Sequence, residues 1–207
     1  MEIGLDDAYS LSSPDDNRKL YAKWAATYES DFVKKQGYEH PKVIAEIFNR
    51  EIPVVQKVID VGTGTGLVGF HLKNLRNIIL DGIDISPEML AEAKLKNVYR
   101  NLYERDLTKP IEKVDAPYDA LICIGIFTHG HLGPEALSHL IPLIKKGGYF
   151  VIGANQKYFI ERDFERHFEI LFNSGEIAAP RFENVQVYSI DSEHRESLNV
   201  ISIFQRN

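Results

Sequence analysis

A glycine-rich turn behind a short apolar run is the segment of this chain best suited to chemistry. Residues 57–61 read KVIDV, and the turn GTGTG, residues 62–66, follows directly. Glycines between a buried strand and the next helix let a ligand approach the backbone closely, and ligands of open α/β sheets bind at the carboxyl ends of the strands. We therefore expect a binding loop at this turn.

Two classes of ligand fit the spacing of the turn. The pattern G-x-G-x-x-G that begins at Gly64 fits a dinucleotide fingerprint, whereas D-x-G-x-G-x-G, which begins at Asp60, fits an S-adenosylmethionine loop. Asp84 serves either ligand, because it follows Gly64 by 20 residues and ends the next apolar run, where a carboxylate accepts both ribose hydroxyls.

Asp60 favours the second ligand. A dinucleotide places a doubly negative pyrophosphate on the amides of such a turn, and a carboxylate that projects there would repel it. A ligand with an amino acid group instead offers an ammonium, with which Asp60 can pair directly or through water. The alternative is that Asp60 only caps the loop or the helix. A bare carboxylate in a buried strand is costly, which favours a ligand role.

The elements that position these residues alternate between strand and helix. We expect strands at 57–61, 78–85, 98–104, 118–127 and 149–154, and helices at 67–75, 86–97, 134–146 and 158–172. Lys145 and Lys146 would lie in the last turn of the third of these helices. Such alternation predicts a mostly parallel, Rossmann-like sheet with helices on both faces. The final runs, 183–191 and 198–205, are too close together for a helical crossover and should be antiparallel, which gives seven strands with a reversed last one.

The N-terminal part is expected to form a cap. Residues 1–16 are polar and acidic and should be mobile, and helices are expected at about 17–33 and 43–48. Tyr21, Trp24 and Tyr28 share one face of the first helix. The predicted organisation is a single domain over 17–207, with 17–50 as its helical cap or lid.

Composition sets outer limits on function. The chain has 207 residues and a net charge of -6, so we expect one ordinary globular domain without an extended nucleic-acid surface. Cys123 is the only cysteine, so no intrachain disulfide can form. Neither a signal peptide nor an apolar run of about 20 residues is found, and we expect a cytoplasmic protein without a membrane partner. Oligomeric state cannot be derived from the sequence.

Five segments, and the order in which they follow one another along the chain, resemble class I S-adenosylmethionine-dependent methyltransferases. They are VIDVGTGTGLVG, DGIDISPEML, YERDLTKP, YDALICIGIFTHGHLGPEAL and IKKGGYFVIG. The segments YAKWAATYESD, DISPEMLAEAK and FTHGHLGPEAL are similar to the methyltransferase-like proteins of the Williams–Beuren region. Thr63 departs from the cysteine that many relatives carry there, but backbone groups do most of the binding at that position.

The resemblance implies a role for each matching residue. Gly62, Thr63 and Gly64 would cradle the methionine part, and Asp84 would hold the ribose. Ile85 and Met89 would flank the adenine, whose edge would meet Asp106 and Leu107. Ile124 and Gly125 would line the methionine side. Tyr21 or Tyr28 would reach the cofactor carboxylate, the alternative being that the aromatic stripe is buried core.

The reaction implied is methyl transfer from the sulfonium to an acceptor, most simply a small molecule or a protein side chain. Catalytic residues are not defined by the sequence, but His129 and His131 follow the fourth strand and are candidates for a general base. A metal site is not expected, since no Cys or carboxylate nearby completes one. The alternatives are an NAD(P)-dependent oxidoreductase and a noncatalytic S-adenosylmethionine-binding module.

Overall fold

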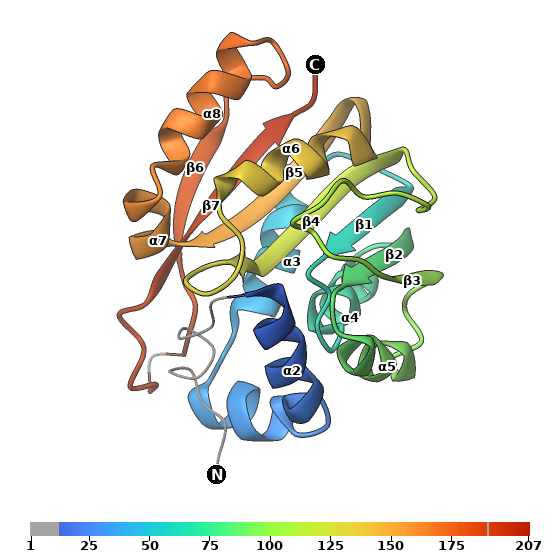
Figure 1. The fold of residues 1–207 in the computed structure, drawn as a ribbon, viewed down its shortest axis with the longest axis vertical. Helices are drawn as coiled ribbons and strands as arrows, with labels where there is room; N and C mark the ends of the chain where they lie inside the picture. Colours follow the sequence, from blue (N-terminus) through green and yellow to red (C-terminus); the bar gives the residue numbers. More distant parts are fainter. Residues whose placement is uncertain (1–12, 190) are drawn as a thin grey trace.

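A seven-stranded sheet forms the centre of the molecule (Figure 1). The computed structural model describes residues 13–189 and 191–207. Of the segment 1–16 that is expected to be mobile, residues 1–12 lie outside the described residues, whereas the expectation is wrong for residues 14–16, which form the first turn of a helix capped by Ser13. The strand order is β3-β2-β1-β4-β5-β7-β6. The strands are β1 (Lys57–Val61), β2 (Ile79–Asp84), β3 (Asn101–Glu104), β4 (Tyr118–Phe127), β5 (Ile144–Asn155), β6 (Arg181–Gln186) and β7 (Leu198–Gln205).

The direction of the strands confirms the predicted fold class. β1 to β5 run parallel, and β7 pairs antiparallel with both β5 and β6. The inner strands are mostly apolar because both faces of the sheet are covered, as for β1 and β4, whose residues are mostly buried. The carboxyl ends of the parallel strands therefore meet along one edge of the sheet, and β1 and β2 bring the glycine turn and Asp84 to it.

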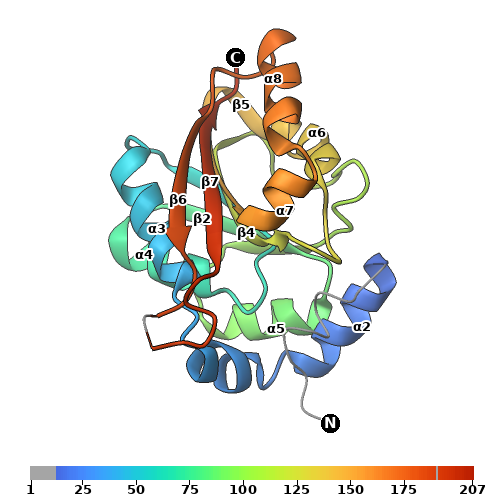
Figure 2. The ribbon, with the colours of Figure 1, turned by 90° about the vertical axis from the view of Figure 1, so that its left-hand side faces the viewer.

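Helices cover both faces of the sheet (Figure 2). On one face, α3 (His40–Glu51) and α4 (Leu67–Leu75) bury Phe48, Ile44 and Leu72 against β1, β4 and β5. On the other face, α6 (Leu137–Leu140), α7 (Gln156–Glu161) and α8 (Phe164–Asn173) bury Phe159 and Phe168. Figure 1 shows α5 (Pro87–Leu95) beside β2 and β3. It begins as predicted at Ser86, whose hydroxyl accepts the Met89 amide at 3.2 Å.

The cap is smaller than expected and is made of two short helices. α2 (Pro14–Trp24) begins at Ser13, which caps the Asp16 amide, and a π-helix, η1 (Glu29–Lys34), follows after a turn. Both lie along the carboxyl edge of the sheet (Figure 1). The predicted helix at 43–48 is longer, and as α3 it packs on the sheet face instead of serving as a lid.

The prediction of a single helix at 134–146 is wrong. Residues 134–143 form three short pieces, η2 (Pro134–Ala136), α6 and η3 (Ile141–Leu143), and β5 begins at Ile144. Lys145 and Lys146 are therefore strand residues, and Lys145 Nζ lies 2.7 Å from Asp119 Oδ1 of β4. The single helix expected at 158–172 is also divided, because Asp163 adopts a left-handed φ of 50° between α7 and α8. Within the described residues, no helix is long and apolar enough to cross a membrane.

Candidate active site

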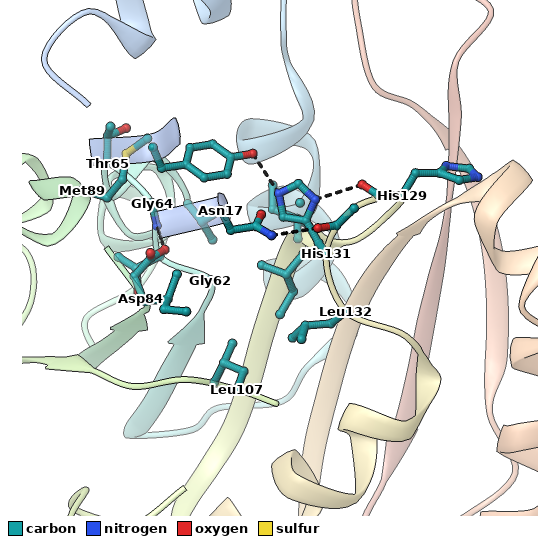
Figure 3. A pocket seen from close by; sticks show the side chains of 18 of the residues that line it. Asn17, Gly62, Gly64, Thr65, Asp84, Met89, Leu107, His129, His131 and Leu132 are labelled. Atoms are coloured by element: carbon teal, nitrogen blue, oxygen red, sulfur yellow. Dashed lines mark hydrogen bonds between the residues drawn. The ribbon is translucent and has the colours of Figure 1, made fainter. Parts of the chain in front are cut away.

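A cavity of about 460 Å³ lies between the cap and the carboxyl edge of the sheet. Its wall takes residues from α2, from the glycine turn, from the ends of β2 and β4, and from α7. Figure 3 shows Gly64 and Asp84 on one side of this cavity and His131 and Leu132 on the other. A volume of this size suits a small-molecule or cofactor site.

The glycine turn forms one wall of the cavity and needs its glycines. Gly62, Gly64 and Gly66 have φ of 76°, 54° and 87°, in the left-handed region that side chains rarely adopt. A Cβ at Gly62 would lie 2.3 Å from Cγ2 of Ile126, whereas a Cβ at Gly64 would meet nothing within 4 Å. The backbone at Gly64 is therefore open to the cavity, as a backbone cradle requires.

Asp84 is held in place by the turn that it faces. Its Oδ2 accepts the Gly64 amide at 2.7 Å, and its Oδ1 accepts the Ser86 amide at 2.9 Å. Burial raises the pKa of this carboxyl, and the amides of Ser86, Gly64 and Ile85 act in the opposite direction. The carboxylate thus has a fixed orientation on the cavity wall before any ligand arrives.

Asp60 departs from the expectation that it projects into the ligand site. It is not among the residues that line the cavity, and it is 1% exposed beneath the glycine turn. The Tyr99 hydroxyl donates to its Oδ2 at 2.6 Å. Burial raises the pKa of Asp60 to about 7, and the nearby Asp84 charge adds to the rise. The reason is the alternation of side chains along β1, which directs Asp60 to the face covered by α4, where Tyr99 packs against Gly69. Asp60 can thus act on a ligand through its charge below the loop.

All other residues predicted for the cofactor site line the cavity. They are Tyr21, Tyr28, Gly62, Thr63, Gly64, Asp84, Ile85, Met89, Asp106, Leu107, Ile124 and Gly125. They come from the cap and from the ends of four strands, so only the fold brings them together.

Both candidate histidines reach the cavity, but their surroundings differ. Nδ1 of His131 lies 3.0 Å from the His129 carbonyl, which can only accept, so Nδ1 carries the proton. Nε2 then carries the lone pair and accepts the Tyr21 hydroxyl at 3.0 Å (Figure 3). Burial lowers the pKa of His131, which keeps the ring neutral. His129 instead faces the mouth, with its Nε2 2.8 Å from Glu161 Oε2.

Two further polar residues on the cavity wall were not predicted from the sequence. Asn17 of α2 donates through Nδ2 to the Gly130 carbonyl at 2.8 Å, which leaves its buried Oδ1 without a hydrogen-bond partner among the described residues. Thr65 Oγ1 is buried and likewise lacks a partner there. Asn17 stands in a polar stretch with no motif, so no local signal could identify it, whereas Thr65 belongs to the turn itself. Two unsatisfied buried polar atoms in one cavity fit a polar ligand.

Comparisons with known proteins agree with the resemblance to methyltransferases. Residues 59–150 match the family described as a methyltransferase domain. The chain is 30% identical over 141 residues to human methyltransferase-like protein 27, a match that covers 65% of this chain and 57% of that protein. The chain thus spans little more than half of this relative.

Solved structures share the fold. A Haloferax volcanii methyltransferase, in complex with the Trm112 methyltransferase activator, is 16% identical with a TM-score of 0.65, over 90% of this chain and 97% of its own. Magnesium protoporphyrin IX methyltransferase of Synechocystis, with bound S-adenosylhomocysteine, is 18% identical with a TM-score of 0.62, over 94% and 99%.

The sheet order, the glycine turn and the family match define a methyltransferase domain. Residues 59–150 match the methyltransferase-domain family, and the chain as a whole has the fold of solved S-adenosylmethionine-dependent methyltransferases. The cofactor of this class is S-adenosylmethionine.

Proposed function

We propose that this protein transfers the methyl group of S-adenosylmethionine to a small molecule or a protein side chain. The observation that carries the proposal is the pairing of the Asp84 carboxylate with the Gly64 amide on the wall of a cavity closed by the cap. A carboxylate fixed beside an open backbone turn suits a ligand with a ribose and an amino acid end. The two unsatisfied atoms, Asn17 Oδ1 and Thr65 Oγ1, fit that ligand as well.

Different residues of the cavity wall bind different parts of the cofactor. Asp84 accepts hydrogen bonds from the ribose, and Ile85 and Met89 flank the adenine, whose edge meets Asp106 and Leu107. The backbone of the glycine turn and of Ile124 and Gly125 holds the methionine part. Asn17 Oδ1 accepts a hydrogen bond from the ammonium, the group with which Asp60 is expected from the sequence to pair directly or through water. The Asp60 charge supports the cationic ligand from below.

His131 is the proposed general base. Its Nε2 has the lone pair, its ring is neutral, and its orientation is fixed by the His129 carbonyl and the Tyr21 hydroxyl. The cofactor, when bound, supplies an activated methyl group, so the chain has to position the acceptor and exclude water. A proton released by the acceptor passes to Nε2, directly or through Tyr21.

The two rival functions make different predictions for ligand binding. An NAD(P)-dependent oxidoreductase would bind a dinucleotide, but the Asp60 carboxylate lies buried beneath the glycine turn, where its charge disfavours a pyrophosphate. A noncatalytic module would bind the cofactor without turnover.

Calorimetry tests the proposal. S-adenosylmethionine and S-adenosylhomocysteine should bind the protein, and NAD and NADP should not. Binding of NAD without binding of S-adenosylhomocysteine would overturn the proposal. Cofactor binding without methyl transfer to any compound of an acceptor panel would favour the noncatalytic module.

A further inference from the structure

A second, smaller cavity adjoins the one described above. It has a volume of about 80 Å³ and lies between the cap, the end of β4 and the segment that follows β6. The two cavities share Tyr21, Tyr28, Tyr38, Gly125 and His131 on their walls. The Tyr21–His131 hydrogen bond thus borders both spaces, and a molecule in the second cavity lies next to the proposed base.

The wall of the second cavity is aromatic. The ring of Trp24 lies 5.1 Å from that of Tyr28 and 5.4 Å from that of Phe32, between centroids. Tyr38 and Tyr188, both next to Phe32, continue the wall, with centroids 5.5 Å apart. Such rings favour apolar or planar groups.

None of the described residues that line this cavity is an Asp, Glu, Lys or Arg. His131 is the only histidine among the described residues that line the cavity, and burial keeps its ring neutral by lowering its pKa. A carboxylate or an ammonium would therefore lose its water here without gaining an ionic partner. This argues that the part of a ligand that enters is uncharged.

Two polar atoms of the wall are unsatisfied. Trp24 is 3% exposed, and its Nε1 has no hydrogen-bond partner within the described part of the chain; the same holds for Thr128 Oγ1. Indole N–H only donates, so it requires a lone pair from whatever enters. Buried donors of folded proteins rarely stay unpaired, so the orphaned Nε1 points to a ligand atom. An alcohol or phenol oxygen supplies that lone pair without a charge.

We infer that the second cavity is the acceptor subsite and that it takes the hydroxyl-bearing end of an uncharged alcohol or phenol, held by Trp24 Nε1 and Thr128 Oγ1. The inference rests on the proposed function and deepens it by naming the class of substrate. A cavity of about 150 Å³ is known to hold benzene, so this smaller space admits the hydroxyl and its first carbons, and the remainder extends into the larger cavity.

The chemistry balances at this position. An O–CH3 bond forms on the acceptor oxygen while the S–CH3 bond breaks, and the electron pair of that bond stays on the sulfur. The hydroxyl proton passes to the Tyr21 oxygen as Tyr21 gives its own proton to His131 Nε2. The products are a methyl ether, S-adenosylhomocysteine and a protonated His131, which releases its proton to solvent when the site opens.

A single tryptophan makes the inference directly testable, because Trp24 is the only one in the chain. With S-adenosylhomocysteine bound, its fluorescence is followed during titration with two sets of matched probes. One set is benzyl alcohol, benzylamine and benzoate, and the other is isobutanol, isobutylamine and isobutyrate. The alcohols should change the emission saturably, and the amines and carboxylates should not.

Two substitutions isolate the proposed hydrogen bonds. Thr128→Val removes a hydroxyl with little change of shape and should weaken alcohol binding by calorimetry roughly 2- to 12-fold, the range of one neutral hydrogen bond. Trp24→Phe removes the indole donor together with one ring, and should weaken alcohol binding at least as much. The affinity for S-adenosylhomocysteine should not change, and that result also reports that the variant is folded. Phe172→Leu, on the exposed side of α8, is the control and should leave alcohol binding unchanged.

The outcomes separate the two proposals. If S-adenosylhomocysteine fails to bind the unmodified protein, the proposed function is wrong. If it binds, but amines or carboxylates bind as tightly as the alcohols, the acceptor class is wrong while methyl transfer stands. Alcohol binding that is unaffected by both Trp24→Phe and Thr128→Val, or that leaves the Trp24 emission unchanged, overturns the subsite itself.

Discussion

The hydroxyl of Tyr21 lies 3.0 Å from Nε2 of His131, and this hydrogen bond joins the cap to the loop after β4 on the wall that both cavities share. The bond has a defined direction, because the His129 carbonyl fixes the proton of His131 on Nδ1. Closure of the cap and orientation of the proposed base therefore depend on the same contact.

His131→Gln should lower kcat of methyl transfer to the best acceptor of the probe panel. General bases contribute about 10²- to 10⁴-fold, and the loss should fall in that range. His129→Gln is the matched control and should cost much less, since His129 pairs with Glu161 at the mouth. Equal losses for the two variants would remove His131 from its role.

The pH dependence of kcat should report the protonation of His131. A base acts when it is deprotonated, and burial lowers the pKa of His131 below its usual 6.5. Activity should therefore persist below pH 6.5 before it falls with further acidification. Tyr21→Phe, which deletes the donor to Nε2, should change the position of this acid limb, whereas a purely structural role would leave it in place.

Asp84→Ala should weaken the binding of S-adenosylhomocysteine at least about tenfold. Hydrogen bonds to a charged group contribute roughly 1.5–3 kcal/mol each, and two ribose hydroxyls would lose their acceptor. The fold should survive, because Asp84 ends β2 at the edge of the sheet. Glu169→Ala removes an equal charge from the exposed side of α8 and should have no effect on calorimetric affinity. Full affinity in Asp84→Ala would mean that the ribose lies elsewhere.

The affinity for S-adenosylmethionine should rise as the pH increases through about 7, where Asp60 titrates in the free protein. The ligand carries a net positive charge, which favours ionised Asp60 and lowers its pKa, so binding releases a proton in this range. S-adenosylhomocysteine has no sulfonium and should depend on pH less. Calorimetry in buffers of different ionisation enthalpy measures the proton release, and Asp60→Asn should abolish it. A pH dependence that survives this substitution would assign the titration to another group.

Local pattern sufficed for part of this fold. The strands 57–61 and 198–205 and the helix 67–75 have the predicted bounds, and the segment 118–127 contains the fourth strand as predicted, because apolar runs there end at glycines or polar turns. The segment 134–146 did not follow its apolar pattern. Pro142 interrupts its helical hydrogen bonds, and pairing of Tyr118 with Ile144 draws the next residues into the sheet. Such pairing depends on a partner far along the chain, which a local window does not contain.

The same distinction applies to the site. The glycine turn and Asp84 follow from a motif and a spacing, and the structure brings them within 2.7 Å. The contact of Asp60 with Tyr99 joins residues 39 apart, and that of Asn17 with Gly130 joins residues 113 apart. No motif encodes either contact, so the orientation of Asp60 and the presence of Asn17 required the fold.

The cap should act as a lid whose backbone amides become more protected from hydrogen exchange when ligand binds. The amides of α2 and η1 should exchange their hydrogens more slowly after addition of S-adenosylhomocysteine, while the exchange rates of the β1 and β4 amides should barely change. Asn17 and Tyr21 hold the cap to the loop after β4, and Lys96 Nζ lies 2.5 Å from Glu29 Oε1. These polar contacts, together with the aromatic cluster around Trp24 and Phe32, hold the cap outside the two cores that flank the sheet, so the cap can open without disturbing the sheet.

Removal of residues 1–35 separates the lid from the competing view that its aromatic stripe is core. Trp24 and Phe32 are buried against Val187 and Tyr188, in a cluster apart from the two cores that flank the sheet. The truncated chain should therefore keep its sheet by circular dichroism while its affinity for S-adenosylhomocysteine falls, because Asn17 and Tyr21 are lost from the wall. If truncation instead abolishes the fold, and the amides of α2 are fully protected without ligand, the stripe is a permanent part of the core and the lid interpretation fails.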